Sequence, residues 1–498
     1  MVELTAPVGS WASLKAAIDN GADSVYLGVG DLNMRSSSAL NFSLDDLPRL
    51  VRICHENNLK IYITLNTIVY DDELEKINNI LDRLQQNGVD AVIASDIAVI
   101  LKAAIDNGAD SVYLGVGDLN MRSSSALNFS LDDLPRLVRI CHENNLKIYI
   151  TLNTIVYDDE LEKINNILDK LQQNGVDAVI ASDIAVILKA AERGLPVHIS
   201  TQANITNIEA IKFFSQWATT VVLARELTLD KIKILSEKIK AENILGPNGE
   251  LVRIETFVHG ALCMAVSGKC YMSLDLEGKS ANRGECHQIC RRKYKLFNAE
   301  TNEEILIDRE HIMSPKDLCT LPFIDKLIDS GISVFKIEGR GRQPEYVALT
   351  TRIYHEAIQS VYDNTFSQTK VASWMEDLKR VYNRGFWDGY YLGRTIGEWT
   401  DREGSSASEL KEYIGFVSNY FAKINVAEVY LDAGQLNVND RIYIIGPNTG
   451  VMEFQINELR DNNGNVIQFS NKNIVTFKVP NRVRKNDKVY LIKNRNND

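Results

Sequence analysis

The sequence predicts an α/β protein built around a (β/α)8 (TIM-like) barrel, with an extra duplicated segment of three βα units and a small C-terminal β-barrel domain. Three observations support this prediction. Apolar strand-like runs alternate with amphipathic helical patterns over most of the chain, which is typical of a parallel sheet covered by helices. One long segment occurs twice in tandem, and short alternating strands separated by turns follow residue 408.

The duplication is almost perfect. Residues 14–100 and 101–187 have the same sequence, apart from Arg83 in the first copy and Lys170 in the second. Structural repeats in natural proteins diverge far more between units. We therefore count the elements of the fold with one copy removed. The other copy is expected to form an αβ appendage or an exchanged element, and the sequence does not say which copy enters the barrel.

Eight strand-like runs are present when one copy is counted. Eight βα units are the number that closes a (β/α)8 barrel, whereas the eleven runs of the full chain would not fit in one. Each run is rich in β-branched or aromatic residues, and helical patterns follow most of them. The eight runs lie near residues 3–9, 24–30, 60–67, 90–96, 197–205, 220–227, 253–260 and 333–340.

The domain boundaries follow from these patterns. The barrel domain is expected over residues 1–365, including both copies and a cysteine-rich insertion at 261–319. Residues 366–407 form a connecting segment. Residues 408–498 carry alternating strands and turns such as DNNGN, which predict the β-barrel domain. This domain is slightly basic, so it is the better candidate for RNA contact, with a dimerisation or lid role as the alternative.

Composition indicates a soluble cytoplasmic protein. No apolar run approaches the length that spans a bilayer. The first residues, MVELTAPVGSW, lack the charged and apolar regions of a secretory signal. The net charge of −11 argues against a chain that coats nucleic acid, so any RNA contact must be local. A homo- or hetero-oligomer is compatible with the sequence.

The cysteines gather in one segment. Five of the seven lie between His259 and Cys319. Clustered thiols in a chain without a secretory signal indicate metal, cluster or redox chemistry rather than disulfides. Zinc is usually held by two short CxxC-type pairs, whereas only one pair is close here, so a 4Fe–4S cluster is favoured over zinc or no metal. Spacing alone does not select four ligands among Cys263, Cys270, Cys286, Cys290 and Cys319.

Candidate site residues lie where strands end, because the chemistry of (β/α)8 barrels occurs at that face. The cysteine segment leaves the seventh strand, so the thiols should lie over this face. The candidate catalytic residues are His259, Glu338 and Arg340. A structural hydrogen bond explains His259 equally well, and an ion pair is the alternative for Glu338. Side chains that could bind an anionic substrate, or that carry an amide at a strand end, are the candidates for substrate binding. They are Gln202, Arg225, Arg291, Arg292 and Arg342.

Hydrolytic motifs are missing from the sequence. There is no GxSxG and no HExxH, and no Ser-His-Asp order stands out. A hydrolytic mechanism therefore has no support from motifs. The basic residues after Cys290, which include Arg291 and Arg292, are either solvent-exposed charges or a phosphate-binding site.

Five stretches closely resemble the collagenase-like peptidase U32 family. They are STQANITN, FVHGALCMAVSGKCYMS, ANRGECHQICRRKY, MSPKDLC and FKIEGRGRQPEYV, at residues 200–207, 257–273, 281–294, 313–319 and 335–347. The resemblance spans almost the whole chain apart from the extra copy, which departs from the family pattern. Members of this family include prephenate-dependent proteins for hydroxylation of the tRNA wobble uridine and a ribosomal RNA cytidine hydroxylation protein. Related members carry a 4Fe–4S cluster.

The resemblance implies an iron–sulfur enzyme that hydroxylates the wobble uridine of tRNA, with tRNA as partner and prephenate as a small anionic co-substrate. Carried onto this sequence, the cluster ligands fall on Cys263, Cys270, Cys286 and Cys319, with Cys290 as the alternative. Two other functions stay open. One is a peptidase, as the family name says, and the other is a non-catalytic partner protein with a structural iron–sulfur cluster.

Overall fold

The computed structural model divides into two compact units, residues 1–102 with 411–493 and residues 103–410 with 494–498. The first division falls at the junction between the two copies. The helix expected at 71–88 lies outside the described residues. The structure describes residues 5–7, 14, 18, 24–28, 42–43, 46–57, 59–65, 91–94, 98–117, 119–121, 123, 129–305, 311–340, 342–394, 397–401, 404–446, 449–471 and 473–495.

The larger unit is built on a run of parallel strands. Strands β5 to β10 pair in chain order, and β14 pairs parallel with β10. A short strand, β13, is antiparallel to the end of β10 and parallel to β15. The bounds are β5 Ser111–Gly115, β6 Lys147–Leu152, β7 Ala178–Ala181, β8 Val197–Ile199, β9 Ala218–Val222, β10 Arg253–Gly260, β13 Asp317–Cys319, β14 Val334–Ile337 and β15 Phe386–Trp387.

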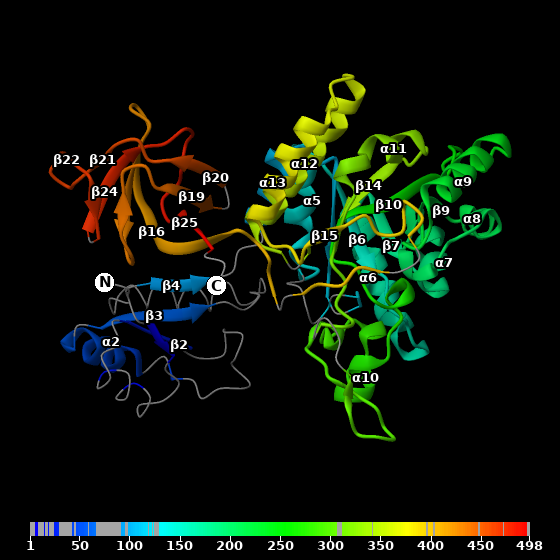
Figure 1. The fold of residues 1–498 in the computed structure, drawn as a ribbon, viewed down its shortest axis with the longest axis horizontal. Coiled ribbons are helices and arrows are strands. Elements are labelled where there is room, and N and C mark those ends of the chain that lie inside the picture. The colour runs from blue at the N-terminus through cyan, green and yellow to red at the C-terminus, as the bar shows by residue number, and fades with distance from the viewer. Residues whose placement is uncertain are drawn as a thin grey trace. The chain divides into compact units, whose positions relative to one another are not determined.

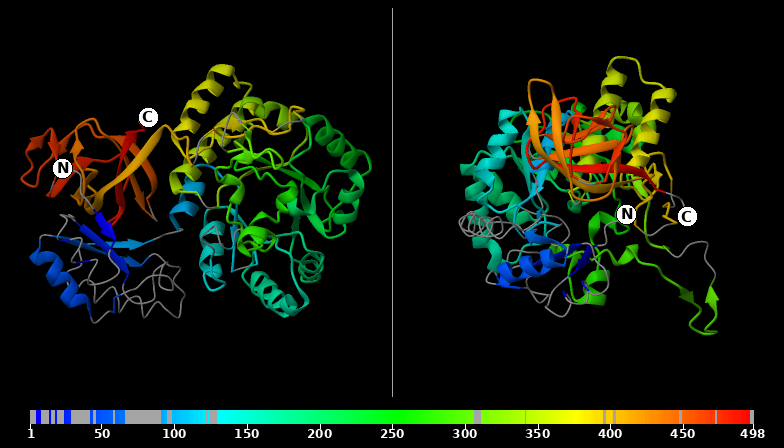
Figure 2. Two further views of the ribbon diagram at one scale, coloured as in Figure 1. Left: turned by 60° about the horizontal axis from the view of Figure 1, so that its bottom comes forward. Right: turned by 90° about the vertical axis from the view of Figure 1, so that its left-hand side faces the viewer.

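Helices lie on the outside of these strands (Figures 1 and 2). Helix α6 shows the pattern, because Ile164, Leu168 and Leu171 follow a helical period and are fully buried. No helix in the described part of the chain is long and apolar enough to cross a membrane. The bounds are α5 Leu134–Glu143, α6 Leu161–Gln173, α7 Ile184–Glu192, α8 Ile208–Ser215, α9 Leu229–Ala241, α10 Met272–Glu277, α11 Ile324–Asp329, α12 Pro344–Tyr362 and α13 Gln368–Arg380.

The second copy supplies the first three strands of this sheet, β5, β6 and β7. The expected strands near 197, 220, 253 and 333 are confirmed and follow in order. The Tyr113 hydroxyl on β5 donates a hydrogen bond to the carbonyl of Ile337 on β14 at 3.0 Å. The two ends of the strand series therefore lie side by side, although no backbone ladder joins β5 to β14 among the described residues. The fold is a mixed α/β fold with a parallel sheet, and the closed eight-stranded barrel stays a prediction.

The smaller unit contains the first copy, whose described strands form a separate parallel sheet together with β1, a strand that precedes the copy. The order is β1-β2-β3-β4, with all pairs parallel. Helix α2 repeats the burial pattern of its counterpart α5 in the second copy, with Leu47, Leu50 and Cys54 buried. The bounds are β1 Thr5–Pro7, β2 Ser24–Gly28, α2 Leu47–Glu56, β3 Lys60–Leu65 and β4 Ala91–Ala94, and α4, Ala98–Asp106, crosses the division between the units.

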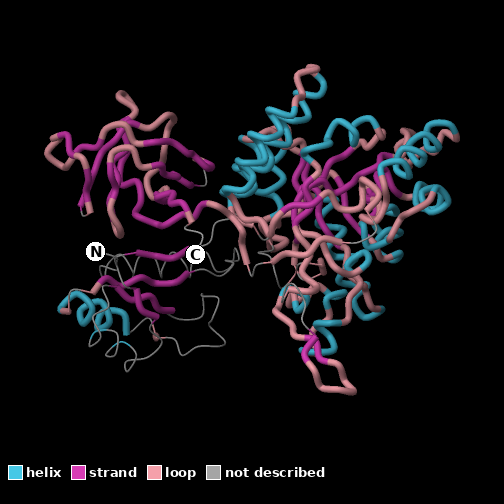
Figure 3. Tube along the Cα trace, in the orientation of Figure 1, coloured by secondary structure: helices cyan, strands magenta, loops and turns pink. Residues whose placement is uncertain are grey.

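The C-terminal part of the smaller unit is a β domain, as the alternating sequence predicts. Eight strands pair in the order β20-β19-β25-β16-β17-β24-β21-β22, and Figure 3 shows this part as strands and loops. Alternate side chains such as Val429, Ile444 and Val489 fill one core. The bounds are β16 Glu409–Phe421, β17 Val426–Leu431, β18 Leu436–Asn437, β19 Arg441–Gly446, β20 Gly450–Gln455, β21 Leu459–Arg460, β22 Val466–Ile467, β23 Phe469–Ser470, β24 Asn473–Lys478 and β25 Lys488–Asn494.

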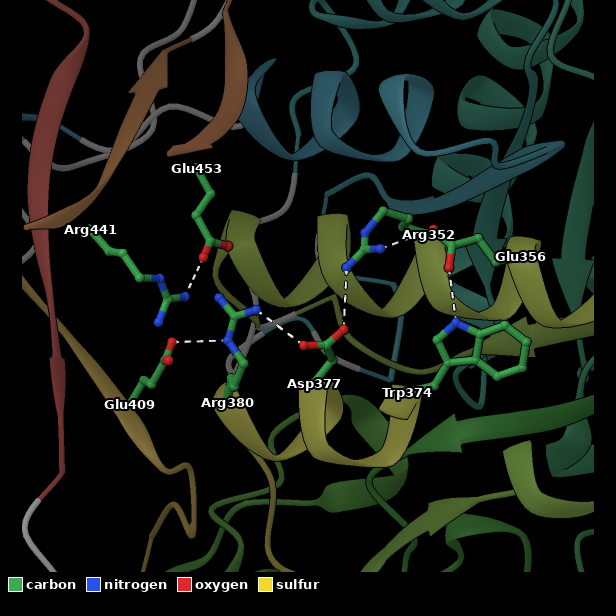
Figure 4. Close-up of polar contacts among 8 residues, drawn as sticks. All are labelled: Arg352, Glu356, Trp374, Asp377, Arg380, Glu409, Arg441 and Glu453. Carbon is green, nitrogen blue, oxygen red and sulfur yellow. Dashed lines mark hydrogen bonds and ion pairs between the residues drawn. The ribbon is translucent and has the colours of Figure 1, made fainter. Parts of the chain in front are cut away.

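Polar contacts hold helices α12 and α13 together (Figure 4). Arg352 pairs with Glu356 at 2.9 Å and with Asp377 of the neighbouring helix at 3.8 Å. Asp377 also pairs with Arg380 at 3.2 Å, and the Trp374 indole donates to Glu356 at 2.9 Å. A separate contact joins α12 to β10, because the Tyr354 hydroxyl donates to the carbonyl of Val258 at 2.8 Å.

Candidate functional site at the strand ends

Polar side chains meet at the carboxyl ends of the parallel strands. Asn153 follows β6 and Gln202 follows β8, and the Asn153 amide donates to Gln202 Oε1 at 3.0 Å. Arg340 follows β14 and donates through Nη1 to Thr151 Oγ1 at 2.9 Å and to Asn120 Oδ1 at 3.1 Å. Two of the predicted site residues, Gln202 and Arg340, therefore contact the same strand, β6, and its end.

The cysteine-rich insertion lies over these strand ends. Ser267 Oγ donates to Asn204 Oδ1 at 2.9 Å, just beyond β8. Gly284 approaches the segment after β5 so closely that a Cβ on it would lie 2.2 Å from the carbonyl oxygen of Asn120. Gly284 also has φ +87°, a conformation that L side chains rarely adopt. Only glycine fits this contact, which brings the insertion down onto the sheet.

Four of the five thiols of the insertion lie near one another. Burial raises the pKa of Cys290, the charge of Arg291 opposes this, and the three other thiolates would raise it further. The other three are Cys263, which is exposed, and Cys270 and Cys286, which like Cys290 are half-buried. Within the described ranges no three His, Cys, Asp or Glu side chains already stand in position to hold a metal ion. Ligation therefore requires these thiols to turn toward a common centre.

Cys319 lies apart from this group. It sits on β13 opposite His259 and is 3% exposed. Its Sγ is 3.7 Å from the sulfur of Met375 and 3.8 Å from the hydroxyl of Tyr354. Burial raises the pKa of the Cys319 thiol to about 11. Cys290, rather than Cys319, interacts electrostatically with the other three cysteines, and the ligand set that the resemblance implies stays a prediction.

His259 is buried behind the site rather than open to it. It is 2% exposed, and its Nδ1 lies 3.4 Å from the Tyr354 hydroxyl. The rings of Tyr346 and Phe386 lie 6.0 and 5.7 Å from its centroid. Burial lowers the pKa of His259 to about 3, helped by the charge of Arg342, so the ring is neutral at physiological pH. These contacts agree with the structural alternative for His259, and its catalytic role stays a prediction.

Charged groups of both signs interact with Glu338. Arg225 donates to the carbonyl of Ala261 at 2.9 Å. Burial lowers the pKa of Arg225, and the nearby Glu338 carboxylate opposes this. Burial acts in the same way on Arg342, but the Asp317 and Glu338 carboxylates outweigh it and raise the pKa of Arg342. Glu338, 9% exposed, is therefore a buried carboxylate that interacts electrostatically with two predicted substrate-binding arginines.

Arg291 and Arg292 differ in their surroundings. Arg291 donates to the carbonyls of Pro315 at 2.6 Å and Leu262 at 2.7 Å, so it braces the insertion internally. Arg292 keeps a side chain that is 56% exposed and forms an ion pair with Glu277. Of the two predicted phosphate contacts, only Arg292 faces solvent.

A buried ion pair beneath the site was missed by our reading of the sequence. Lys336 Nζ lies 2.5 Å from Glu255 Oε1, and both side chains are nearly inaccessible. The second oxygen of Glu255 is 3.8 Å from Nδ1 of His198, whose pKa burial lowers to about 4. Lys336 Nζ also lies 4.3 Å from the centroid of the Tyr113 ring. The sequence signal that could have predicted this ion pair is a charged residue inside each of two apolar strands, Glu255 in RIETFVHG and Lys336 in SVFKIEGR.

Comparison with known proteins identifies the class to which this fold and site belong. The sequence profile of Peptidase family U32 matches residues 9–102 and again residues 99–401. The chain belongs to this family, and the first copy matches it as a separate, partial hit.

Relatives within the family carry two kinds of name. A collagenase of Porphyromonas gingivalis is 47% identical over 78% of this chain and 94% of its own length. A 23S rRNA 5-hydroxycytidine synthase of Escherichia coli is 35% identical over 60% of this chain and 45% of its own length. A tRNA hydroxylation protein of Helicobacter pylori is 36% identical over 59% of this chain and 69% of its own length.

Proposed function

We propose that this chain is a cytoplasmic iron–sulfur enzyme that hydroxylates RNA, with the wobble uridine of tRNA as its target. The observation that carries the proposal is the grouping of Cys263, Cys270, Cys286 and Cys290 over the strand ends. Relatives named as rRNA and tRNA hydroxylation proteins support the reaction class. In this proposal the parallel strands belong to a (β/α)8 barrel, and the C-terminal strands form a β-barrel that adds RNA contacts.

The four grouped cysteines would hold a 4Fe–4S cluster. Four thiolates from separate loops are a ligand set that such clusters take, and the cluster supplies one-electron chemistry when bound. The backbone N–H of Ala265 and the positive charge of Arg225 both favour the thiolate of Cys263. The chain thus provides a soft donor set beside a cation that balances its charge.

Arg340 and Arg342 would bind the anionic co-substrate, for which we propose prephenate. Arg340 is oriented by Thr151 and Asn120, so little conformational freedom is lost when a carboxylate binds. Arg342 is stacked 3.7 Å from the ring centroid of Tyr382. Glu338, held close to Arg342, is the group placed to accept or return a proton beside the bound anion.

The test is complementation of a strain that lacks this protein, with tRNA nucleosides measured by mass spectrometry. Wild-type protein should restore hydroxyuridine, and Cys290→Ala should not. Arg340→Lys keeps the charge but loses the planar fork, so we expect a loss of about tenfold or more in hydroxyuridine formation. Arg352→Lys, on helix α12 away from the strand ends, is the matched control. Full hydroxyuridine in the strain without the protein would contradict the proposal.

A second candidate function is proteolysis, which the 47% identity to a protein named collagenase favours. The Ser200 hydroxyl at the strand ends contacts the amides of Asn153 and Gln202 rather than a histidine. This arrangement does not supply the general base that a serine nucleophile needs. Gelatin cleavage by purified protein that is lost in Ser200→Ala would support the peptidase, and its absence would leave the RNA-modifying reaction.

A further inference from the structure

Two tyrosines stand exposed beside the cysteine group. Tyr271 directly follows Cys270 and is 72% exposed, and Tyr157, in the segment after β6, is 56% exposed. Single exposed apolar side chains are ordinary on protein surfaces. These two, however, are connected through the same short piece of the insertion, Asn282 and Arg283.

Asn282 joins the segment of Cys270 to the segment after β6. Its side-chain oxygen accepts a hydrogen bond from the backbone N–H of Cys270 at 3.3 Å. Its carbonyl oxygen accepts one from the backbone N–H of Ile155 at 3.5 Å. The backbone that carries Tyr271 and the backbone that carries Tyr157 are therefore tied to one residue.

Arg283 fixes the Tyr157 side of this arrangement. Its guanidinium carbon lies 4.6 Å from the centroid of the Tyr157 ring. Its Nη1 donates to Glu160 Oε2 at 2.7 Å, which holds the guanidinium in place. A cation fixed over one face of an aromatic ring restrains the ring and adds positive charge beside it.

We propose that Tyr157 and Tyr271 are a stacking platform for unpaired RNA bases, which positions one base at the cysteine centre. This inference rests on the RNA-modifying function proposed above. An enzyme that modifies a base must take it out of its stack, and aromatic rings receive such bases whatever their sequence. Lys279 and Arg292, 51% and 56% exposed on the same insertion, are ion-paired with Glu285 and Glu277 and would exchange these carboxylates for the flanking phosphates.

The test is fluorescence anisotropy with two labelled RNAs, a hairpin with a single-stranded loop and a fully paired duplex of the same length. We expect Tyr157→Ala and Tyr271→Ala each to weaken hairpin binding about tenfold and to leave duplex binding unchanged. Tyr271→Trp should retain binding because the stacking surface is kept. Tyr362→Ala is the matched control, since Tyr362 is 66% exposed at the end of α12. Thermal unfolding of each variant checks that the fold is intact.

The outcomes separate the platform from the function on which it rests. If wild-type protein binds the hairpin and both alanine variants bind it equally well, the platform is wrong and the RNA-modifying function stands. If wild-type protein binds neither RNA, both fail. An equal loss for hairpin and duplex would indicate a general defect and overturn the platform. The platform would also be overturned if the alanine variants kept RNA binding but lost a bound protein partner.

Discussion

At the scale of single residues, the decisive comparison is between Cys290 and Cys319. Both lie in the insertion segment, and the sequence offers nothing that ranks them, because a loop can return from any distance to meet its partners. The structure separates them by surroundings. Cys290 is half-buried among thiols and Arg291, whereas Cys319 packs against Met375 and the Tyr354 hydroxyl. The spacing of the cysteines predicts a cysteine centre, but it does not predict that Cys319 lies on strand β13, apart from the other four.

His259 gives a prediction on pH. Its folded-state pKa of about 3 lies below the unfolded value of about 6.5. As pH falls below about 6.5 the unfolded chain takes up a proton and the folded chain does not, so the free energy of unfolding decreases. Between pH 7 and pH 5 this removes about 2 kcal/mol of stability, and His198 acts in the same direction.

The measurement is urea unfolding of wild type and His259→Gln at pH 7 and pH 5. Wild type should be more stable than the variant at pH 7, and the gap should narrow by about 2 kcal/mol at pH 5 because the variant lacks this titrating group. An equal gap at both values of pH would show that His259 is not held neutral by burial.

At the scale of elements, strand positions were predictable and strand partners only partly so. The run KIYITL of β6 is buried at every position except Lys147, so it reads as a nearly continuous apolar stretch that is buried on both faces of a parallel sheet. The two copies differ at one position only, Arg83 against Lys170. No local propensity could therefore choose between them, and the choice depends on long-range pairing with β8.

The pair that joins β10 to β14 gives a prediction at this scale. Lys336→Met leaves Glu255, 2% exposed, without its nearest cation, so we expect a loss of about 3–5 kcal/mol in the free energy of unfolding. The double variant Lys336→Met/Glu255→Met removes both charges and should recover most of that loss. Urea unfolding of wild type and the two variants is the measurement. A double variant no more stable than the single one would contradict this account.

At the scale of the whole molecule, one of the two copies is separable from the site. The candidate site residues and the grouped cysteines follow residue 200, and the second copy completes the sheet that carries them. The (β/α)8 prediction counted one copy only. The described strands β5 to β10 and β14 are parallel, and β5 to β10 pair in chain order, as that prediction requires. The sequence could not determine closure, because closure depends on long-range pairing between the first and last strands of the series.

Deletion of one copy tests this separation. A chain without residues 14–100 and a chain without residues 101–187 differ only in carrying Lys170 or Arg83, so each is the control for the other. We expect both to fold, to unfold at the same temperature as each other, and to bind as much iron as the full chain, because each keeps one complete set of strands. Thermal unfolding and iron analysis check this. Failure of both shortened chains to fold would show that the two copies are jointly required.

The central claim is that Cys263, Cys270, Cys286 and Cys290 together hold an iron–sulfur cluster. The most direct measurement is the absorbance and iron content of protein purified without oxygen, for wild type, Cys290→Ala and Cys319→Ala. We expect wild type and Cys319→Ala to show a broad band near about 400 nm and about four irons per chain, and Cys290→Ala to lose most of both. A colourless, zinc-loaded wild type, or iron lost in Cys319→Ala and kept in Cys290→Ala, would contradict the account.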